Sequence, residues 1–347
     1  MKRIFLGMVA LALGFTSCDK NEEAISSEQE SIDMSDFNLY TDIAIAGEAK
    51  PSADANLKNC FSMANLNRLL DETPGLYKKM YDVEYQTRVK QVGKGKPGSG
   101  GGEEPTPPGD NLGVITIPVY VHVVYSNSNE NISDAQIASQ MAVLNQDFRK
   151  TNADSNSIPS EFAGLAADTE VQFTLVNTFR HANSKTSWGT NDQVKTTYPP
   201  VTPQTHLNIW VCNIGGGILG YAQFPGGPAA TDGIVVGPNY FGTTGYVSSP
   251  FDKGRTTTHE IGHYLNLRHI WGDGRCKQDD YVADTPSSDG PNYGCPSYPT
   301  VNCRSTDMTM NYMDYTNDAC MSMFSNGQKA RLRTIFTAGG PRAAMAN

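Results

Sequence analysis

The sequence lacks two features: an apolar run long enough to span a membrane and a surplus of basic residues. Residues 4–15 form an apolar run of only 12 residues, whereas a transmembrane helix needs about 20. The formal net charge of −9 argues against a protein that binds nucleic acid through a basic surface. Hydrophobic residues make up 38% of the 347, too many for a disordered chain, and no segment is repeated. The chain therefore contains one large globular domain with appendages, or two domains.

The N-terminus has the composition of an export signal. Lys2 and Arg3 precede the apolar run, which indicates a signal peptide over residues 1–17. The run leads through small residues to Cys18, a pattern that resembles a bacterial lipobox, in which the cysteine becomes a lipid-modified N-terminus. An ordinary secretory signal followed by a chance cysteine is the alternative. We expect an outer-membrane lipoprotein of the bacterial cell envelope, held to the membrane through Cys18, or a protein secreted after processing.

Three segments of distinct composition follow the signal. Residues 19–60 contain ten Asp and Glu against three Lys, a net charge of −7, so we expect an acidic tether over residues 18–55. Residues 93–110 contain seven Gly and four Pro and form a linker. Between them, residues 56–92 have apolar residues at helical spacing, which a Pro-Gly pair divides into two short helices. This segment is either a removable prosegment or a structural spacer.

Residues 111–347 are numerous enough to form a single hydrophobic core. A helix is expected from Ser133, whose spacing to Gln136 fits a capping box, to Phe148. Runs of β-branched and aromatic residues predict strands at 114–125, 171–179, 206–211, 218–224 and 234–236. These elements indicate an α/β or α+β domain.

Three of the six histidines lie within 11 residues of one another. His259 and His263 are four residues apart, so on a helix both imidazoles lie on the same face and can share a metal ion. Glu260 is turned by about 100° from His259 and can reach a metal-bound water without being a ligand. His269 can join them only if the chain turns back near Asn266, a residue type that tolerates the left-handed conformation. Three neutral imidazoles and a water would form a catalytic zinc site with an open position.

This run resembles the metzincin metallopeptidase motif HExxHxxGxxH, with Asn266 in place of the usual glycine. Downstream, residues 311–315 are similar to the metzincin Met-turn, with Met313 as an apolar floor beneath the metal. Over most of residues 111–347 the chain resembles the pappalysin family, including its bacterial ulilysin-like members. The resemblance implies an α/β (α+β) metzincin-type zinc peptidase fold. Such a fold has a twisted, mostly parallel sheet with an antiparallel edge strand, an active-site helix and a C-terminal Met-turn subdomain.

The resemblance also implies roles for single residues. Glu260 would act as the general base, and Tyr315 would support the developing oxyanion. Asp318 would lie at the floor of the S1′ pocket and favour cleavage before Arg or Lys. Residues 218–221 would form the edge strand along which an extended peptide aligns. A core tyrosine and a surface aspartate in a turn are the alternatives for Tyr315 and Asp318.

Calcium and two disulfides complete these expectations. Asp280, Asp284 and Thr285 offer oxygen ligands of the kind that calcium prefers, in a loop where the family binds calcium. Solvated turn residues are the alternative. Four cysteines near the C-terminus permit three pairings. The resemblance favours Cys276–Cys303 and Cys295–Cys320.

Cys60 stands at the start of the expected prosegment. Its thiolate could occupy the open metal position and keep the enzyme latent, a device that this superfamily uses. A Cys60–Cys212 disulfide is the alternative. We favour the thiolate switch, with Cys212 as a buried thiol.

These features predict an exported zinc endopeptidase that is made as a latent zymogen. It would be a monomer, would act on proteins or peptides, and would have no nucleic-acid partner. An inactive peptide-binding or adhesion protein on the same fold is one alternative, and the presence of Glu260 with all three histidines argues against it. A zinc esterase or amidase acting on a small substrate is another.

Overall fold

The computed structural model describes residues 32–42, 57–92 and 110–346. The expected signal peptide, Cys18, most of the acidic tether and nearly all of the linker lie outside these residues. The described residues from Met34 onward form one packed unit, and of the other unit, residues 1–33, only the last two residues are described. Within the described ranges, no helix is long and apolar enough to cross a membrane.

Helices and strands alternate through the larger part of the described chain. The helices are α1 (Ser62–Glu72), α2 (Leu76–Val92), α3 (Asp134–Phe148), α4 (Ser160–Ala163), α5 (Gln193–Thr197), α6 (Arg255–Tyr264) and α7 (Asn326–Thr334). The strands are β1 (Ile115–Tyr125), β2 (Val171–Ala182), β3 (Leu207–Val211), β4 (Gly220–Ala222), β5 (Ile234–Val236), β6 (Val301–Asn302) and β7 (Ser305–Thr306). Short 3-10 helices cover Ala153–Ser157, Ala229–Thr231, Pro238–Tyr240, Asp318–Cys320 and Ala343–Met345.

The main sheet has five strands in the order β2-β1-β3-β5-β4. Strands β2, β1, β3 and β5 are parallel, and β4 runs antiparallel to β5 at one edge. The expectation of a mostly parallel sheet with an antiparallel edge strand is therefore confirmed. In the first half of β1 buried residues alternate with exposed or half-buried ones, and both faces are buried over residues 121–124.

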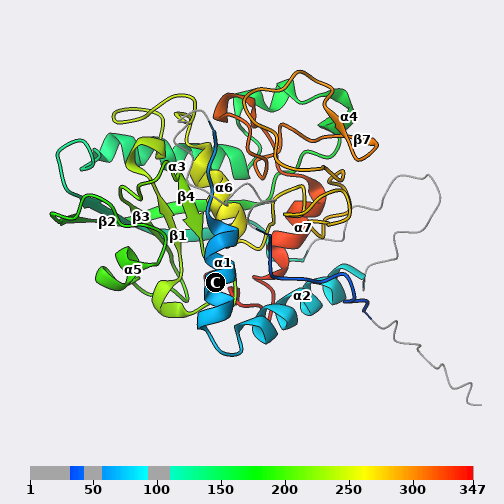
Figure 1. Cartoon of the computed structure of the whole chain (residues 1–347), viewed down its shortest axis with the longest axis horizontal. Coiled ribbons are helices and arrows are strands. Elements are labelled where there is room, and N and C mark those ends of the chain that lie inside the picture. The colour runs from blue at the N-terminus through cyan, green and yellow to red at the C-terminus, as the bar shows by residue number, and fades with distance from the viewer. Residues whose placement is uncertain (1–31, 43–56, 93–109, 347) are drawn as a thin grey trace, which may run out of the picture. The chain divides into compact units, whose positions relative to one another are not determined.

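Side chains pack on both faces of the central part of the main sheet, whereas most of strand β2 is exposed or half-buried. Val119 and Val121 of β1 belong to one hydrophobic cluster with Leu144 of α3 and Ile261 of α6. On the other face, Trp210 lies in a second cluster with side chains of β4 and β5. Helix α6 contacts α3, β4 and β5, which fixes the HExxH segment beside the edge strand (Figure 1).

The N-terminal helices pack onto this domain. Helix α1 ends at Glu72 and helix α2 begins at Leu76, so the two are separated at Pro74-Gly75, as expected. Apolar side chains of α1 and α2 form a cluster with Leu39 and with Phe224, which follows β4. Helix α1 contacts β4, and α2 contacts α7 (Figure 1). The segment expected to be a prosegment therefore covers the edge of the sheet next to α6.

Two local expectations need correction. Ser133 caps α3 by accepting a hydrogen bond from Gln136 N at 3.2 Å, but the Gln136 side chain donates to the Pro238 and Phe241 carbonyls. Only half of the capping box is therefore formed. The strand expected at 218–224 is confined to the three residues of β4, because Phe224 turns into the cluster with α1 and α2.

Candidate active site

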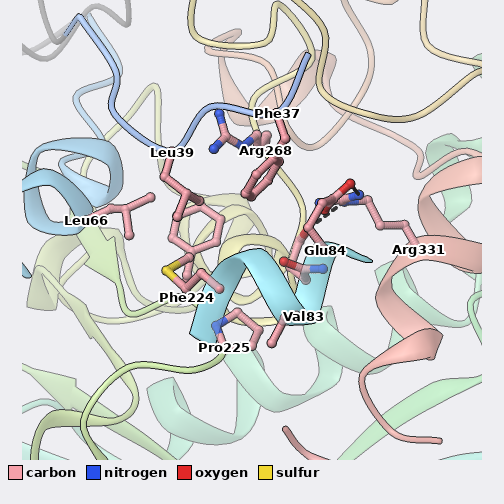
Figure 2. A pocket seen from close by; sticks show the side chains of 11 residues that line it. Phe37, Leu39, Leu66, Val83, Glu84, Phe224, Pro225, Arg268 and Arg331 are labelled. Carbon is pink, nitrogen blue, oxygen red and sulfur yellow. Dashed lines mark hydrogen bonds and ion pairs between the residues drawn. The ribbon is translucent and has the colours of Figure 1, made fainter. Parts of the chain in front are cut away.

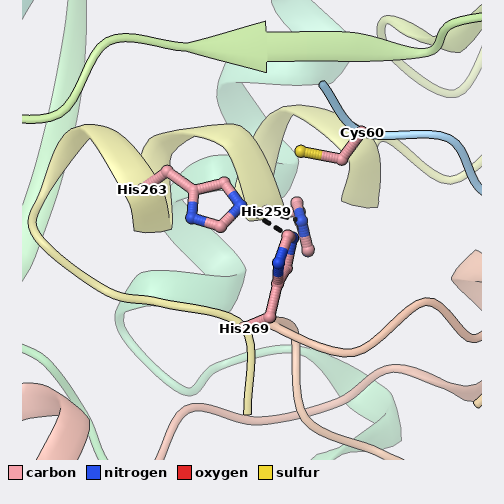
Figure 3. A group of neighbouring side chains, drawn as sticks. All are labelled: Cys60, His259, His263 and His269. Atoms are coloured by element: carbon pink, nitrogen blue, oxygen red, sulfur yellow. Dashed lines mark hydrogen bonds between the residues drawn. The ribbon is translucent and has the colours of Figure 1, made fainter. Parts of the chain in front are cut away.

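Helix α6 and the turn after it bring three imidazoles together (Figure 3). The Nε2 atoms of His259 and His269 each lie 3.1 Å from Nε2 of His263. All three side chains are completely buried. The chain turns back at Asn266, whose φ of 78° is the left-handed conformation that the sequence predicted.

The other nitrogen of each ring is held by an acceptor. His259 Nδ1 donates to the Tyr312 carbonyl at 2.7 Å, His263 Nδ1 to the Leu267 carbonyl at 2.8 Å, and His269 Nδ1 to the Asp273 carboxylate. Burial lowers the pKa of His259 and His263 well below the usual range, which favours the neutral ring. A neutral ring with its proton on Nδ1 has only a lone pair on Nε2, so these three nitrogens cannot hydrogen-bond to one another. The three converging lone pairs fit a metal ion, with an orienting acceptor behind each ring.

The Met-turn lies directly beneath α6. Met313 is completely buried, and a Cβ on Gly262 would lie 2.3 Å from its Sδ, so glycine lets the methionine approach the helix. Trp271 stacks on His269 with ring centroids 4.4 Å apart, and Tyr315 meets the same ring edge-on at 4.9 Å. These side chains form an apolar floor and wall around the imidazoles.

Glu260 is buried beside the edge strand. A Cβ on Gly220 would lie 2.9 Å from Glu260 Cγ, so a glycine in β4 makes room for the carboxylate. Ser62 of α1 donates from Oγ to Glu260 Oε2 at 2.8 Å and accepts a hydrogen bond from Ala222 N, also at 2.8 Å. Burial raises the pKa of Glu260 to about 7, and the Ser62 hydrogen bond opposes this rise. The carboxylate next to the imidazoles is thus engaged by the N-terminal segment.

Cys60 completes the cluster of potential ligands. One ligand atom from Cys60 and from each of the three histidines lie within 4.8 Å of one another (Figure 3). The Tyr315 hydroxyl donates to the Cys60 carbonyl at 3.4 Å. No disulfide joins Cys60 to Cys212, which is a buried thiol, so that alternative is wrong.

The chain around Cys60 pairs with the edge strand. Leu219 N donates to Asn59 O at 2.9 Å, and Phe61 N donates to Gly220 O at 3.1 Å. Cys60 and Gly220 form a parallel bridge, so this segment runs in the same direction as β4. The edge where a peptide was expected to align is therefore occupied by the protein's own N-terminal segment.

Lys58, two residues before Cys60, is buried close to Asp318. Lys58 Nζ lies 3.3 Å from Met321 Sδ. Burial lowers the pKa of Lys58, and the Asp318 charge is the main influence that opposes it. Asp318 Oδ2 accepts hydrogen bonds from Lys253 N at 3.0 Å and Arg255 N at 3.1 Å. Its Oδ1 accepts no hydrogen bond from any residue that the structure describes. The structure thus brings a lysine and the predicted specificity carboxylate into one buried region beside the imidazoles.

The loops between α6 and α7 contain both disulfides that the resemblance implied. Cys276 is bonded to Cys303 and Cys295 to Cys320, with sequence separations of 27 and 25 residues.

The three potential calcium ligands lie in two places. The buried Asp280 carboxylate accepts hydrogen bonds from Val282 N at 3.0 Å and Thr285 Oγ1 at 2.9 Å. Asp284 instead accepts from Ser325 Oγ at 2.6 Å and from the Gly327 amide at 2.8 Å, where α7 begins.

Sequence reasoning missed several residues of the site. Asp273 follows His269 by four residues, a spacing that could have identified it as the acceptor behind that ring. Lys58 is two residues from Cys60, and alternate residues of an extended segment lie on the same side. Ser62 carried no signal, and Gly220 was expected only as part of the edge strand, because their partner Glu260 is distant in the sequence.

Comparisons with known proteins agree with this geometry. The family model described as pregnancy-associated plasma protein-A, Peptidase M43, matches residues 189–337. An extracellular metalloprotease of Arthroderma otae is 32% identical over 233 residues, which cover 65% of this chain and 78% of that protein. Extracellular metalloprotease 1 of Coccidioides posadasii is 31% identical over 230 residues, with coverages of 64% and 77%.

Two solved structures from Tannerella forsythia are also similar. Mature mirolysin in complex with a cleaved peptide is 48% identical, has a TM-score of 0.65, and covers 67% of this chain and 95% of its own. A promirolysin mutant is 42% identical, has a TM-score of 0.71, and covers 82% of this chain and 96% of its own. The precursor form thus matches more of this chain than the mature form does.

Proposed function

The chain belongs to the pappalysin family of metalloendopeptidases, Peptidase M43, and from this premise we propose that it is a zinc endopeptidase made as a latent zymogen, which cleaves before arginine or lysine. The observation that carries the proposal is the placement of the N-terminal segment. It brings Cys60 to the three histidines, Ser62 to Glu260 and Lys58 to the vicinity of Asp318.

The catalytic residues act around a metal held by His259, His263 and His269. When bound, zinc would lower the pKa of its water to about 7 and polarise the scissile carbonyl. Glu260 accepts the water proton and returns it to the leaving amine. The Tyr315 hydroxyl, which donates to the Cys60 carbonyl in the precursor, donates to the developing oxyanion once the segment has left.

Latency follows from three contacts made by one short segment. With the metal bound, the Cys60 thiolate would take the ligand position of the catalytic water. The Ser62 hydroxyl donates to Glu260 Oε2, an oxygen that would otherwise accept the water proton. The segment also fills the edge of β4 on which a substrate would form backbone hydrogen bonds. Cleavage in the linker of residues 93–110 and departure of residues 56–92 would release all three blocks together and leave residues 111–347 as the catalytic domain.

The surroundings of Asp318 support a preference for a basic residue after the scissile bond. Lys58 places an ammonium group there in the precursor, yet it contacts Met321, and Asp318 Oδ1 has no hydrogen-bond donor among the described residues. A guanidinium group is longer and presents parallel N–H donors that match a carboxylate. Arginine is therefore expected to be the better substrate side chain.

Calcium, export and lipid attachment belong to the same proposal. The buried Asp280, whose pKa is raised by burial and by the neighbouring Asp279 charge, would bind calcium together with Thr285. Asp284, which was expected to join them, instead accepts hydrogen bonds from Ser325 and Gly327 at the start of α7. A higher melting temperature with calcium than with a calcium-selective chelator would support this site.

Cys18 would hold the exported precursor, as a monomer, to the membrane, and cleavage in residues 93–110 would release the catalytic domain.

The proposed reaction is tested by digestion of a denatured protein with the activated enzyme. We expect cleavage that a zinc chelator abolishes and added zinc restores. The Glu260→Ala variant should bind zinc in a 1:1 ratio but cleave nothing. Proteolysis by this variant, or proteolysis that persists after zinc is removed, would contradict the proposal.

The specificity is tested with peptides that have Arg, Lys or Leu after the scissile bond. In the Asp318→Asn variant, the ratio of kcat/KM for Arg over Leu peptides should fall by about 10- to 100-fold, since a charge-assisted hydrogen bond contributes roughly 1.5–3 kcal/mol. Asp289→Asn, on the exposed loop, is the matched control and should retain the ratio. An unchanged ratio in Asp318→Asn would exclude this carboxylate as the determinant.

A further inference from the structure

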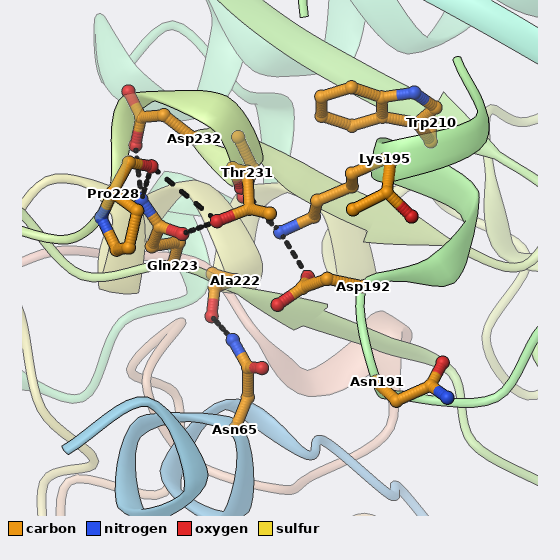
Figure 4. Close-up of polar contacts among 12 residues, drawn as sticks. Asn65, Asn191, Asp192, Lys195, Trp210, Ala222, Gln223, Pro228, Thr231 and Asp232 are labelled. Carbon is orange, nitrogen blue, oxygen red and sulfur yellow. Dashed lines mark hydrogen bonds and ion pairs between the residues drawn. The ribbon is translucent and has the colours of Figure 1, made fainter. Parts of the chain in front are cut away.

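A second buried carboxylate is paired with a cation of the prosegment. Asp192, just before α5, is 2% exposed. Its Oδ1 lies 2.9 Å from Lys195 Nζ, and its Oδ2 contacts the guanidinium of Arg68 on α1. Lys195 also donates to the Thr231 carbonyl at 2.9 Å and to the Gly233 carbonyl at 3.3 Å (Figure 4). The catalytic domain thus anchors Lys195 by itself, whereas the Oδ2 side of Asp192 is occupied by a residue that leaves with the prosegment.

Arg68 is connected to the edge strand by a single side chain. Asn65 Nδ2 donates to the Ala222 carbonyl at 3.0 Å (Figure 4), and Asn65 Oδ1 accepts from Arg68 Nη2 at 2.6 Å. The Arg68 side chain is 25% exposed, whereas that of Asp192 is 3% exposed. The exposed part of this ion pair is therefore on Arg68, and departure of α1 would uncover the Oδ2 side of Asp192.

Helix geometry limits how far Arg68, and with it Asp192, lies from the Glu260 contact along α1. Ser62, which contacts Glu260, and Arg68 are six residues apart on α1, a rise of about 9 Å. An extended peptide covers that distance in about three residues. Lys58 and Asp318 lie on the other side of Cys60 in the same segment, so Arg68 marks the side occupied by residues that precede the scissile bond.

We propose that Asp192 forms a second cation-binding subsite, which binds the guanidinium group of an arginine three or four residues before the scissile bond. Arg68 fills this subsite in the precursor as Lys58 fills the region of Asp318. The preferred substrates are then cationic peptides with two basic residues, one on each side of the cleavage point. The inference rests on the proposed endopeptidase function and extends it to the second side of the cleft.

The test uses the activated wild-type enzyme and peptides with arginine fixed after the scissile bond. A second arginine is placed in turn at each of the four preceding positions and compared with citrulline, which has the same shape without the charge. We expect kcat/KM to be about tenfold higher for arginine than for citrulline at the third or fourth position, since a charge-assisted hydrogen bond is stronger than a neutral one. Equal values at both positions would overturn the proposal while leaving the endopeptidase function intact.

A variant pair assigns the effect to the carboxylate. In Asp192→Asn, the arginine-to-citrulline ratio should fall to about one, whereas Asp134→Asn, an exposed aspartate on α3, should retain the wild-type ratio. A retained ratio in a folded Asp192→Asn enzyme would place the subsite elsewhere. If that variant does not fold, the wild-type comparison of arginine with citrulline still decides whether a cationic subsite exists. Failure to cleave any of the peptides would instead refute the proposed function.

Discussion

Replacement of Glu84 by glutamine should loosen the prosegment from the catalytic domain. Glu84 of α2 and Arg331 of α7 have side chains that are each 2% exposed. They form a two-point ion pair, with Nη1–Oε1 at 3.2 Å and Nη2–Oε2 at 2.6 Å (Figure 2). Arg88 Nε donates to the same carboxylate at 2.9 Å. Glu84→Gln keeps the shape of the side chain but leaves two guanidinium groups facing a neutral amide.

The size of the effect follows from the burial of the pair. Removal of one partner of a buried ion pair destabilises the folded arrangement by about 3–5 kcal/mol. Each 1.4 kcal/mol is a factor of ten, so the fraction of molecules with α2 undocked should rise between about a hundredfold and a few thousandfold. Hydrogen exchange of the amides in residues 76–92 measures this fraction, in a Glu260→Ala background that keeps the precursor uncleaved.

The matched control is Asp82→Asn on the same helix. Asp82 and Lys78 form an exposed ion pair, with side chains 55% and 79% exposed, and an exposed pair should change exchange by less than about threefold. Similar exchange in Glu84→Gln and Asp82→Asn would refute the reasoning.

The same ion pair gives a pH dependence with a defined sign. Burial would raise the pKa of Glu84, but the Arg331 charge and the hydrogen bonds from Arg331 and Arg88 lower it overall. A lowered folded pKa contributes stability that is present above the usual carboxyl pKa, about 4.3, and is lost as the pH falls through the lowered value. Exchange in residues 76–92 should therefore increase below about pH 4 in the otherwise wild-type chain, and this increase should be smaller in Glu84→Gln.

Two further predictions concern the cysteines. In the uncleaved precursor, Cys60→Ala should raise the rate of peptide hydrolysis by about tenfold or more, because a metal–thiolate contact exceeds the roughly 1.4 kcal/mol that a factor of ten represents. Cys212→Ala makes the same change at a thiol in another hydrophobic cluster and should leave the rate unchanged. Equal rates for the two variants would exclude the thiolate switch. Replacing Cys276 and Cys303, or Cys295 and Cys320, by serine should lower the free energy of unfolding by about 3–4 kcal/mol in each case, because the closed loops have nearly equal lengths. Denaturant unfolding measures both losses, and a loss below about 1 kcal/mol would show that the loop is already ordered without its bond.

The metal site could be predicted from sequence because its geometry is local. His259 and His263 lie on the same face of a helix, one turn apart, and the left-handed conformation of Asn266 turns the chain back so that His269 reaches them. A strand at residues 114–125 could be predicted from its β-branched and aromatic residues, whereas the mostly parallel order of the sheet was implied by the family resemblance. The length of β4 could not be predicted, because it depends on Phe224 packing against α1 and α2.

The contacts that keep the precursor latent depend on pairing between distant segments. Ser62 and Glu260 are 198 residues apart, and Glu84 and Arg331 are 247 apart. No local pattern in a single sequence identifies such partners. The proposed role of Asp192 could not be predicted from sequence for the same reason, since it depends on Lys195 nearby and on Arg68, which is 124 residues away.

The close approach of Met313 to α6 restricts how this site can vary. A side chain at position 262 would collide with the methionine sulfur, which lies 2.3 Å from where its Cβ would be. Met313 has no exposed surface, so an oxygen added to its sulfur would have to displace the helix that holds two of the imidazoles. Gly262 and Met313 are therefore coupled sterically: a side chain at position 262 can be accommodated only if the Met313 sulfur moves, and an oxidant reaches that buried sulfur only when the site opens.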